Sequence, residues 1–102
     1  MEKVIKFIAE IEFLDVPMGR QKPFGSGYRP LFKFKNTLSD LSGKIDLMSE
    51  ELFFPGEKKT VFITFIKESF EKYGKDFSQF TFGEGIVSFG KGKLLEKVYA
   101  QH

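Results

Sequence analysis

The segment Lys59-Thr60-Val61-Phe62-Ile63-Thr64-Phe65-Ile66 decides the fold class of this chain. Almost every residue in it is β-branched or aromatic, and such side chains favour extended backbone because they pack well on a pleated, half-buried surface. It is the strongest strand signal in the sequence. We therefore expect a β-strand over residues 59–66.

Outward from this segment, five further stretches carry strand signals, most of them an alternation of apolar and polar residues. They cover residues 4–14, 31–35, 43–48, 77–82 and 86–98. In residues 31–35, Phe32 and Phe34 fall on one face of an extended chain, while Lys33 and Lys35 fall on the other. Together with residues 59–66, these stretches predict six strands.

The connections between the stretches are rich in Gly and Pro, which favour turns. The longest connection, residues 15–30, is a long loop, and long loops in compact domains are often functional. Helical character is confined to a short turn over residues 67–76. Because no helix of 10–15 residues separates the strands, the sequence predicts an all-β fold. We expect a six-stranded antiparallel closed barrel with one short helical turn, formed by residues 1–102 as a single domain.

The composition suits a compact domain and argues against catalysis. Fourteen phenylalanines can fill a small barrel, and burying each one contributes roughly 1.5–3 kcal/mol. The chain has no Cys and its only His is the terminal residue His102, so the usual pairs of nucleophile and base are missing. We expect no enzyme activity, no cofactor and no metal site.

Charge and hydropathy restrict the location of the protein and its partners. No apolar run approaches the ~18–20 residues that a membrane span needs, and the N-terminal residues are charged where a signal peptide is apolar. The net charge of +2 is too small to indicate nucleic-acid binding by itself. We expect a cytoplasmic protein in which any RNA site depends on local clusters of charge.

Two short patterns resemble catalytic motifs. Residues 85–92 match the first part of a phosphate-binding loop, but Gly92 stands where a Ser or Thr would hold magnesium. Their centre reads as a strand, so we interpret Gly90 and Gly92 as sites of close backbone approach and expect no nucleotide site. Glu10 and Glu12 share one strand face, as a glycosidase pair might, but we interpret them as part of an ordinary solvated face. A nucleotide hydrolase that uses Lys91 is the weakest hypothesis.

The most informative pattern is an ordered set of short motifs. The set comprises Gly19-Arg20, Pro23-Phe24, Gly27-Tyr28-Arg29-Pro30, Ser42-Gly43-Lys44-Ile45, Phe54-Pro55-Gly56-Glu57 and Glu84-Gly85. In order and spacing, it resembles the C-terminal β-barrel (domain III) of the bacterial elongation factor Tu family. The resemblance covers about residues 4–98 and implies the same six-stranded barrel, here as a stand-alone domain without GTPase machinery.

The resemblance also implies a set of RNA contacts. In that family the barrel packs on other domains and binds the T-stem of aminoacyl-tRNA through phosphates and 2′-hydroxyls. Carried over, Arg20 would contact a phosphate, while Ser42 and the pair Glu84 and Gly85 would contact sugars. The basic patch would be completed by Lys22, Arg29, Lys33 and Lys35. The set is partial, because Leu31 and Gly83 replace polar residues of the family.

Protein docking is the alternative that we favour. A barrel without its neighbouring domains exposes the surface that they cover in the family, where another protein domain or a second copy of the chain could bind. Phe53 and Phe54 are the expected apolar contact. The sequence thus predicts a non-enzymatic, translation-associated interaction module that docks a protein, with binding of tRNA or another RNA as the alternative.

Overall fold

A computed structural model describes residues 2–34, 39–73 and 79–101 of the chain. These residues form six strands and one short helix. The strands are β1 (Val4–Phe13), β2 (Leu31–Phe34), β3 (Leu41–Leu47), β4 (Lys58–Ile66), β5 (Gln79–Glu84) and β6 (Val87–Ala100), and the helix is α1 (Lys67–Tyr73). Each of the six expected strands is present, and β4 contains the β-branched segment that decides the fold class.

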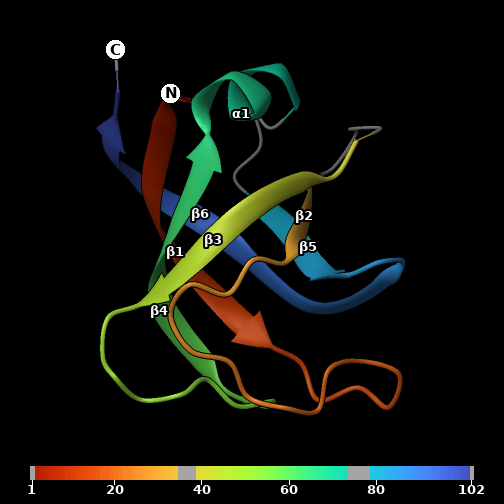
Figure 1. The fold of residues 1–102 in the computed structure, drawn as a ribbon. Helices are drawn as coiled ribbons and strands as arrows, with labels where there is room; N and C mark the ends of the chain where they lie inside the picture. Colours follow the sequence, from red (N-terminus) through yellow and green to blue (C-terminus); the bar gives the residue numbers. More distant parts are fainter. Residues whose placement is uncertain (1, 35–38, 74–78, 102) are drawn as a thin grey trace.

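The strands close into one antiparallel barrel in the order β1-β4-β3-β2-β5-β6 (Figure 1). β1 pairs with β4 along one edge and with β6 along the other. β2 and β5 complete the ring, in a register that runs from Leu31↔Gly83 to Phe34↔Phe80. The prediction of an all-β, six-stranded antiparallel closed barrel with one helical turn is confirmed.

Alternation along the strands builds a core made mainly of phenylalanine. In β1, every second residue from Ile5 to Phe13 is buried, while the residues between them are partly exposed. The largest side chains that are fully buried elsewhere belong to Phe32, Phe34, Phe53, Phe65, Phe82 and Phe89. Among the described residues, no polar or charged residue is buried. Burial of apolar surface, rather than a buried polar network, therefore stabilises the barrel.

Gly90 and Gly92 of β6 make room for two aromatic rings of β5. In the β5–β6 register, Gly90 lies opposite Phe82 and Gly92 opposite Phe80. A Cβ atom on Gly90 would overlap the Phe82 ring, and one on Gly92 would lie 2.5 Å from the carbonyl oxygen of Glu10. The expected close approach is confirmed, and residues 85–92 form a hairpin turn and strand rather than a phosphate-binding loop.

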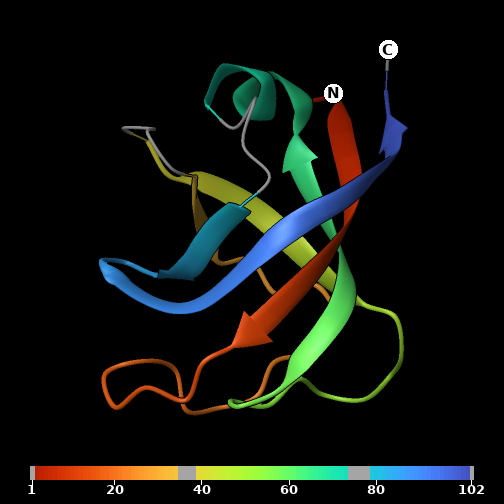
Figure 2. The ribbon, with the colours of Figure 1, turned by 180° about the vertical axis from the view of Figure 1, so that it is seen from behind.

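The two ends of the barrel are closed in different ways. α1 lies at the end where the two termini meet, and its Phe70 packs on Phe7 and Phe65 (Figure 1). At the other end, residues 14–30 form the expected long loop (Figure 2). Two isolated bridges, Phe24↔Phe53 and Tyr28↔Ile45, join this loop to the rest of the barrel. The loop is thus part of the folded structure.

The strand limits differ from the expected ones where pairing extends past the alternating residues. β3 begins at Leu41 rather than residue 43, because Leu41 pairs with Phe32. β5 continues to Glu84 because the turn of the β5–β6 hairpin falls at residues 85–86 rather than 83–85. The start of the expected strand over 77–82 lies outside the described residues.

Candidate functional site

Arg20, Tyr28 and Glu84 form one cluster although they are far apart in the sequence. Arg20 and Tyr28 belong to the 14–30 loop, whereas Glu84 ends β5. Arg20 Nη1 lies 3.2 Å from Glu84 Oε2, and the Tyr28 hydroxyl donates a hydrogen bond to the same oxygen. The guanidinium carbon lies 4.8 Å from the centre of the Tyr28 ring. The cluster therefore joins the long loop to the β5–β6 hairpin.

Arg20 also makes hydrogen bonds within the 14–30 loop. Its Nε donates to the carbonyl oxygen of Lys22 at 2.9 Å, and its Nη2 donates to that of Pro23 at 3.1 Å. A guanidinium has five N–H donors in a rigid plane, so three hydrogen bonds and a ring contact hold it in one orientation. The sequence predicted Arg20 and Glu84 as separate contacts to RNA. The structure makes each the partner of the other.

The surroundings of Tyr28 favour its neutral form. The ring is partly buried and stacks on Phe24 with 4.3 Å between ring centres. Burial, followed by the hydrogen bond to the Glu84 carboxylate, raises the pKa of the Tyr28 phenol above its ordinary value of 10.0. Tyr28 therefore remains a hydrogen-bond donor to Glu84 at neutral pH.

The other residues predicted to contact RNA are spread over the 14–30 loop, β2, β3 and the β5–β6 turn. Lys22, Arg29, Ser42 and Gly85 are exposed, and Gly85 has a φ of 61° in the hairpin turn. Lys33 is exposed on the outer face of β2, with its Nζ 3.9 Å from Asp40 Oδ1. Lys35 lies outside the described residues.

The strand register brings part of this set together. Leu31 of β2 pairs with Ser42 on one side and with Gly83 on the other. Ser42 therefore lies across β2 from the end of β5 that carries Glu84. A hydroxyl and a carboxylate are thus placed on the two strands that flank β2, whereas the cation expected beside them, Arg20, is directed at Glu84.

For the protein interface, the prediction that Phe53 is an exposed contact is wrong, because Phe53 is fully buried. Its backbone exchanges hydrogen bonds with Phe24 at 3.0 and 2.8 Å, and its ring packs on Phe13 and Phe24. Neighbouring residues of an extended segment point to opposite sides. Leu52 and Phe54, which precede and follow Phe53 in the sequence, therefore both point away from the core into solvent. Each is 48% exposed. We did not predict Leu52 as an exposed contact from the sequence, although the alternation of residues 52–54 was a signal that could have identified it.

Leu52 and Phe54 lie on a backbone that is held in place. The Phe54 N–H donates to Glu57 Oε1 at 2.7 Å, and the Gly56 N–H donates to the carbonyl oxygen of Phe13 at 2.6 Å. Gly56 has a φ of 94°, which favours glycine and forms the turn before β4. We call Leu52 and Phe54 the apolar pair.

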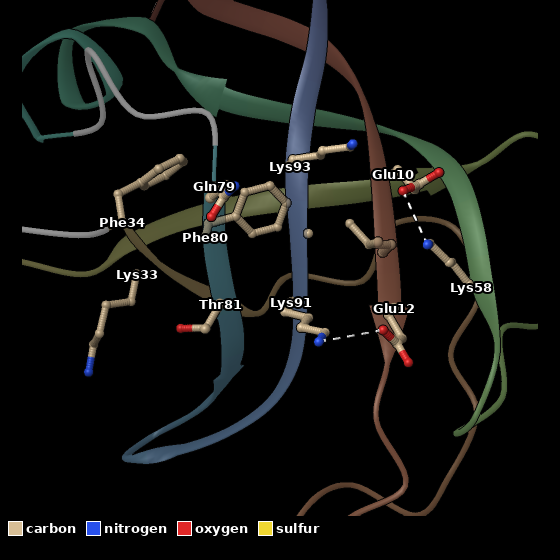
Figure 3. A pocket seen from close by; sticks show the side chains of 12 residues that line it. Glu10, Glu12, Lys33, Phe34, Lys58, Gln79, Phe80, Thr81, Lys91 and Lys93 are labelled. Atoms are coloured by element: carbon tan, nitrogen blue, oxygen red, sulfur yellow. Dashed lines mark ion pairs between the residues drawn. The ribbon is translucent and has the colours of Figure 1, made fainter.

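A groove of about 650 Å³ crosses the outer face of the barrel from β2 to β1 (Figure 3). The register shows how it forms, because Phe34, Phe80, Gly92 and Ile11 lie in one row across four strands. Phe34, Phe80 and Ile11 of this row are buried and point inward, and Gly92 has no side chain, so the backbone of the row forms the floor. Outward-pointing side chains of the two flanking rows form the walls. They are Lys33, Thr81, Lys91 and Glu12 on one side, and Gln79, Lys93 and Glu10 on the other.

The two carboxylates of this groove are paired with lysines. Glu10 Oε1 lies 3.4 Å from Lys58 Nζ, and Glu12 Oε1 lies 3.9 Å from Lys91 Nζ (Figure 3). All four side chains are partly exposed. This arrangement is a polar outer face with weak surface ion pairs.

Within residues 2–34, 39–73 and 79–101, no group of three or more His, Asp or Glu side chains is arranged to hold a metal ion. In the same part of the chain, no helix is long and apolar enough to cross a membrane. The chain matches no model of a known protein family. The likeness to domain III of elongation factor Tu therefore stays a prediction from the sequence motifs.

Proposed function

We propose that this barrel is a non-enzymatic, translation-associated interaction module, similar to domain III of elongation factor Tu, that docks a protein partner through Leu52 and Phe54. One observation supports this proposal above the others: two large apolar side chains project into solvent from a single short segment. Exposed apolar groups that lie together are a common feature of protein interfaces.

The fixed backbone beneath the apolar pair favours binding. Phe53, which lies between Leu52 and Phe54 in the sequence, pairs with Phe24 in an isolated β-bridge. Since the segment is already ordered, docking would lose little conformational entropy there, and more of the apolar burial would appear as affinity. Met48, in the same β3–β4 connection, is also half exposed and would extend the contact.

Site-specific photocrosslinking in the cells that make the protein tests this proposal. A photoreactive phenylalanine analogue replaces Phe54, and we expect one dominant crosslinked protein from the translation machinery. Leu52→Ser in the same chain should weaken that adduct. The matched control carries the analogue at Ile86, which is 99% exposed in the β5–β6 turn. Identical products from positions 54 and 86 would reject docking through the apolar pair.

RNA binding is the second candidate function. It is favoured by the register that places Ser42 across β2 from the end of β5, with Lys33 exposed on β2 itself. Titration with tRNA at two salt concentrations tests it, because each phosphate contact changes the log–log slope by about −0.7 to −0.9. Replacing Arg29 and Lys33 by Ala should make the slope shallower, while Lys3→Ala should not. Binding that does not respond to salt would exclude this function.

A further inference from the structure

The apolar pair, Leu52 and Phe54, lies in an acidic segment of a basic chain. The β3–β4 connection, residues 48–57, contains three of the chain's fourteen Asp and Glu residues and none of its sixteen Lys and Arg residues. It therefore carries a charge of −3, although the whole chain carries +2. Figure 1 shows this connection at the end of the barrel opposite α1. A partner that covers the apolar pair therefore also meets this local negative charge.

The carboxylates of the connection are open to a partner. Glu50 is exposed, and its side chain makes no ion pair or hydrogen bond within residues 2–34, 39–73 and 79–101. The Glu51 side chain is 81% exposed, and its contact with Lys59 Nζ, at 4.0 Å, is a weak surface ion pair. Glu57 accepts the Phe54 N–H through Oε1 at 2.7 Å, which places its charge beside the apolar pair. Little of this negative charge is neutralised within the chain.

The cations that lie nearest in the sequence do not change the sign of this surface. Lys58 Nζ is directed at Glu10 Oε1, 3.4 Å away on the outer face of the barrel. The Lys59 side chain is only 25% exposed. In the 14–30 loop, which pairs with the connection at Phe53, the exposed Asp15 and Lys22 carry opposite charges. The surface around the apolar pair therefore remains net negative.

The negative charge restricts the kind of molecule that can cover the apolar pair. Nucleic acids and anionic membrane lipids would be repelled, because both present negative charge. A protein surface with Lys or Arg around its apolar side chains would be attracted instead. Complementary charges at the rim of an apolar contact steer association and disfavour the wrong partners.

From these observations we infer that the apolar pair docks a basic segment of another protein, in which large apolar side chains lie between Lys or Arg residues. The apolar side chains of that segment contact Leu52 and Phe54. Its cations meet the carboxylates of Glu50, Glu51 and Glu57. This inference rests on the proposed function, docking through the apolar pair, and adds the chemistry of the partner.

Titration of the full chain with two synthetic peptides, followed by amide NMR, tests the charge of the partner. Both peptides carry leucine at the same positions, with lysine between the leucines in one and glutamate in the other. We expect only the lysine peptide to shift the Leu52 and Phe54 amides, and to do so saturably. The net charge of the chain, +2, would favour the opposite preference, so a preference for lysine must arise locally. Raising the salt concentration from about 0.05 to 0.5 M should weaken this binding.

Neutral variants locate the charges that are responsible. Glu50→Gln/Glu51→Gln keeps the size of both side chains and should weaken binding of the lysine peptide about three-fold or more, because each exposed ion pair contributes modestly. The matched control is Glu68→Gln/Glu71→Gln in α1, at the other end of the barrel. It makes the same change of charge and should leave binding unchanged.

The possible failures of this inference and of the proposed function are distinguishable. If the glutamate peptide binds as well as the lysine peptide and Leu52→Ser weakens both, the inference is overturned while docking through the apolar pair stands. The same holds if the two double glutamine variants bind alike. If Leu52→Ser binds the lysine peptide as tightly as the wild type does, both are overturned. If neither peptide shifts the Leu52 and Phe54 amides, the inference is overturned, and the crosslinks from position 54 decide the proposed function separately.

Discussion

Gly90 is a residue at which the barrel wall tolerates little change. It lies opposite Phe82, whose ring occupies the space that a Cβ atom would need. We expect Gly90→Ala to lower the free energy of unfolding by about 1–3 kcal/mol, because overpacking forces side chains and backbone to shift. Urea unfolding followed by circular dichroism measures this loss. Ser88→Ala, at an exposed position of the same strand, should change stability by less than about 0.5 kcal/mol.

A double-mutant cycle separates this clash from other effects of the alanine. In a Phe82→Leu background the ring is absent, so Gly90→Ala should destabilise the barrel less than it does in the wild type. Equal penalties in both backgrounds would mean that the Phe82 ring is not the reason for the glycine.

The raised pKa of Tyr28 should make the folding stability of the protein depend on alkaline pH. Its pKa is raised in the folded protein by burial and by the hydrogen bond to Glu84, so above pH 10.0 the unfolded chain loses the phenol proton more readily than the folded one. The stabilisation from neutral Tyr28 is present below that pH and falls as pH rises. The melting temperatures of wild type and Tyr28→Phe should therefore converge above pH 10. A constant difference from pH 7 to 11 would contradict this account.

At the scale of elements, the Arg20–Tyr28–Glu84 cluster should control the long loop and not the barrel. Arg20→Ala removes the ion pair and both loop hydrogen bonds. We expect the amides of Phe24 and Gly27, which bond to Phe53 and Ile45 across the loop, to exchange with solvent several-fold faster. Amides in the middle of β1 should keep their protection. Lys22→Ala, which removes an exposed side chain of the same loop, is the control, and equal effects of the two variants would exclude the proposed role of Arg20.

The elements were predictable because each strand is marked by its own local alternation. Phe32 and Phe34 indicate the buried face of β2 without any knowledge of its neighbours. The errors arose where a distant segment decides the outcome: Phe53 is buried because the 14–30 loop pairs with it. Arg20 and Glu84 are 64 residues apart and meet only when the barrel closes.

At the scale of the whole molecule, β1 and β6 bring the two ends of the chain together. The Val4 N–H donates to Gln101 Oε1 at 2.8 Å, and the Gln101 N–H donates to the carbonyl oxygen of Val4 at 3.1 Å. Figure 1 shows both termini at the end of the barrel where α1 lies. Nine register pairs join β1 to β6, from Ile5↔Ala100 to Phe13↔Gly90, so much of the sheet forms between distant parts of the sequence.

This arrangement predicts that a circular permutant folds, and folds faster than the natural chain. A linker of about four Gly and Ser residues would join the ends, and new termini would open between Ser49 and Glu50 in the exposed β3–β4 connection. The nine β1–β6 pairs become local, whereas the five β3–β4 pairs and the Phe24↔Phe53 bridge become distant, so the average sequence separation of contacts falls and the folding rate should rise. Stopped-flow refolding measures the rate, and urea unfolding should show a free energy within about 2 kcal/mol of the natural chain. A permutant that is folded but refolds more slowly would show that pairing of β3 with β4, rather than closure between β1 and β6, limits folding.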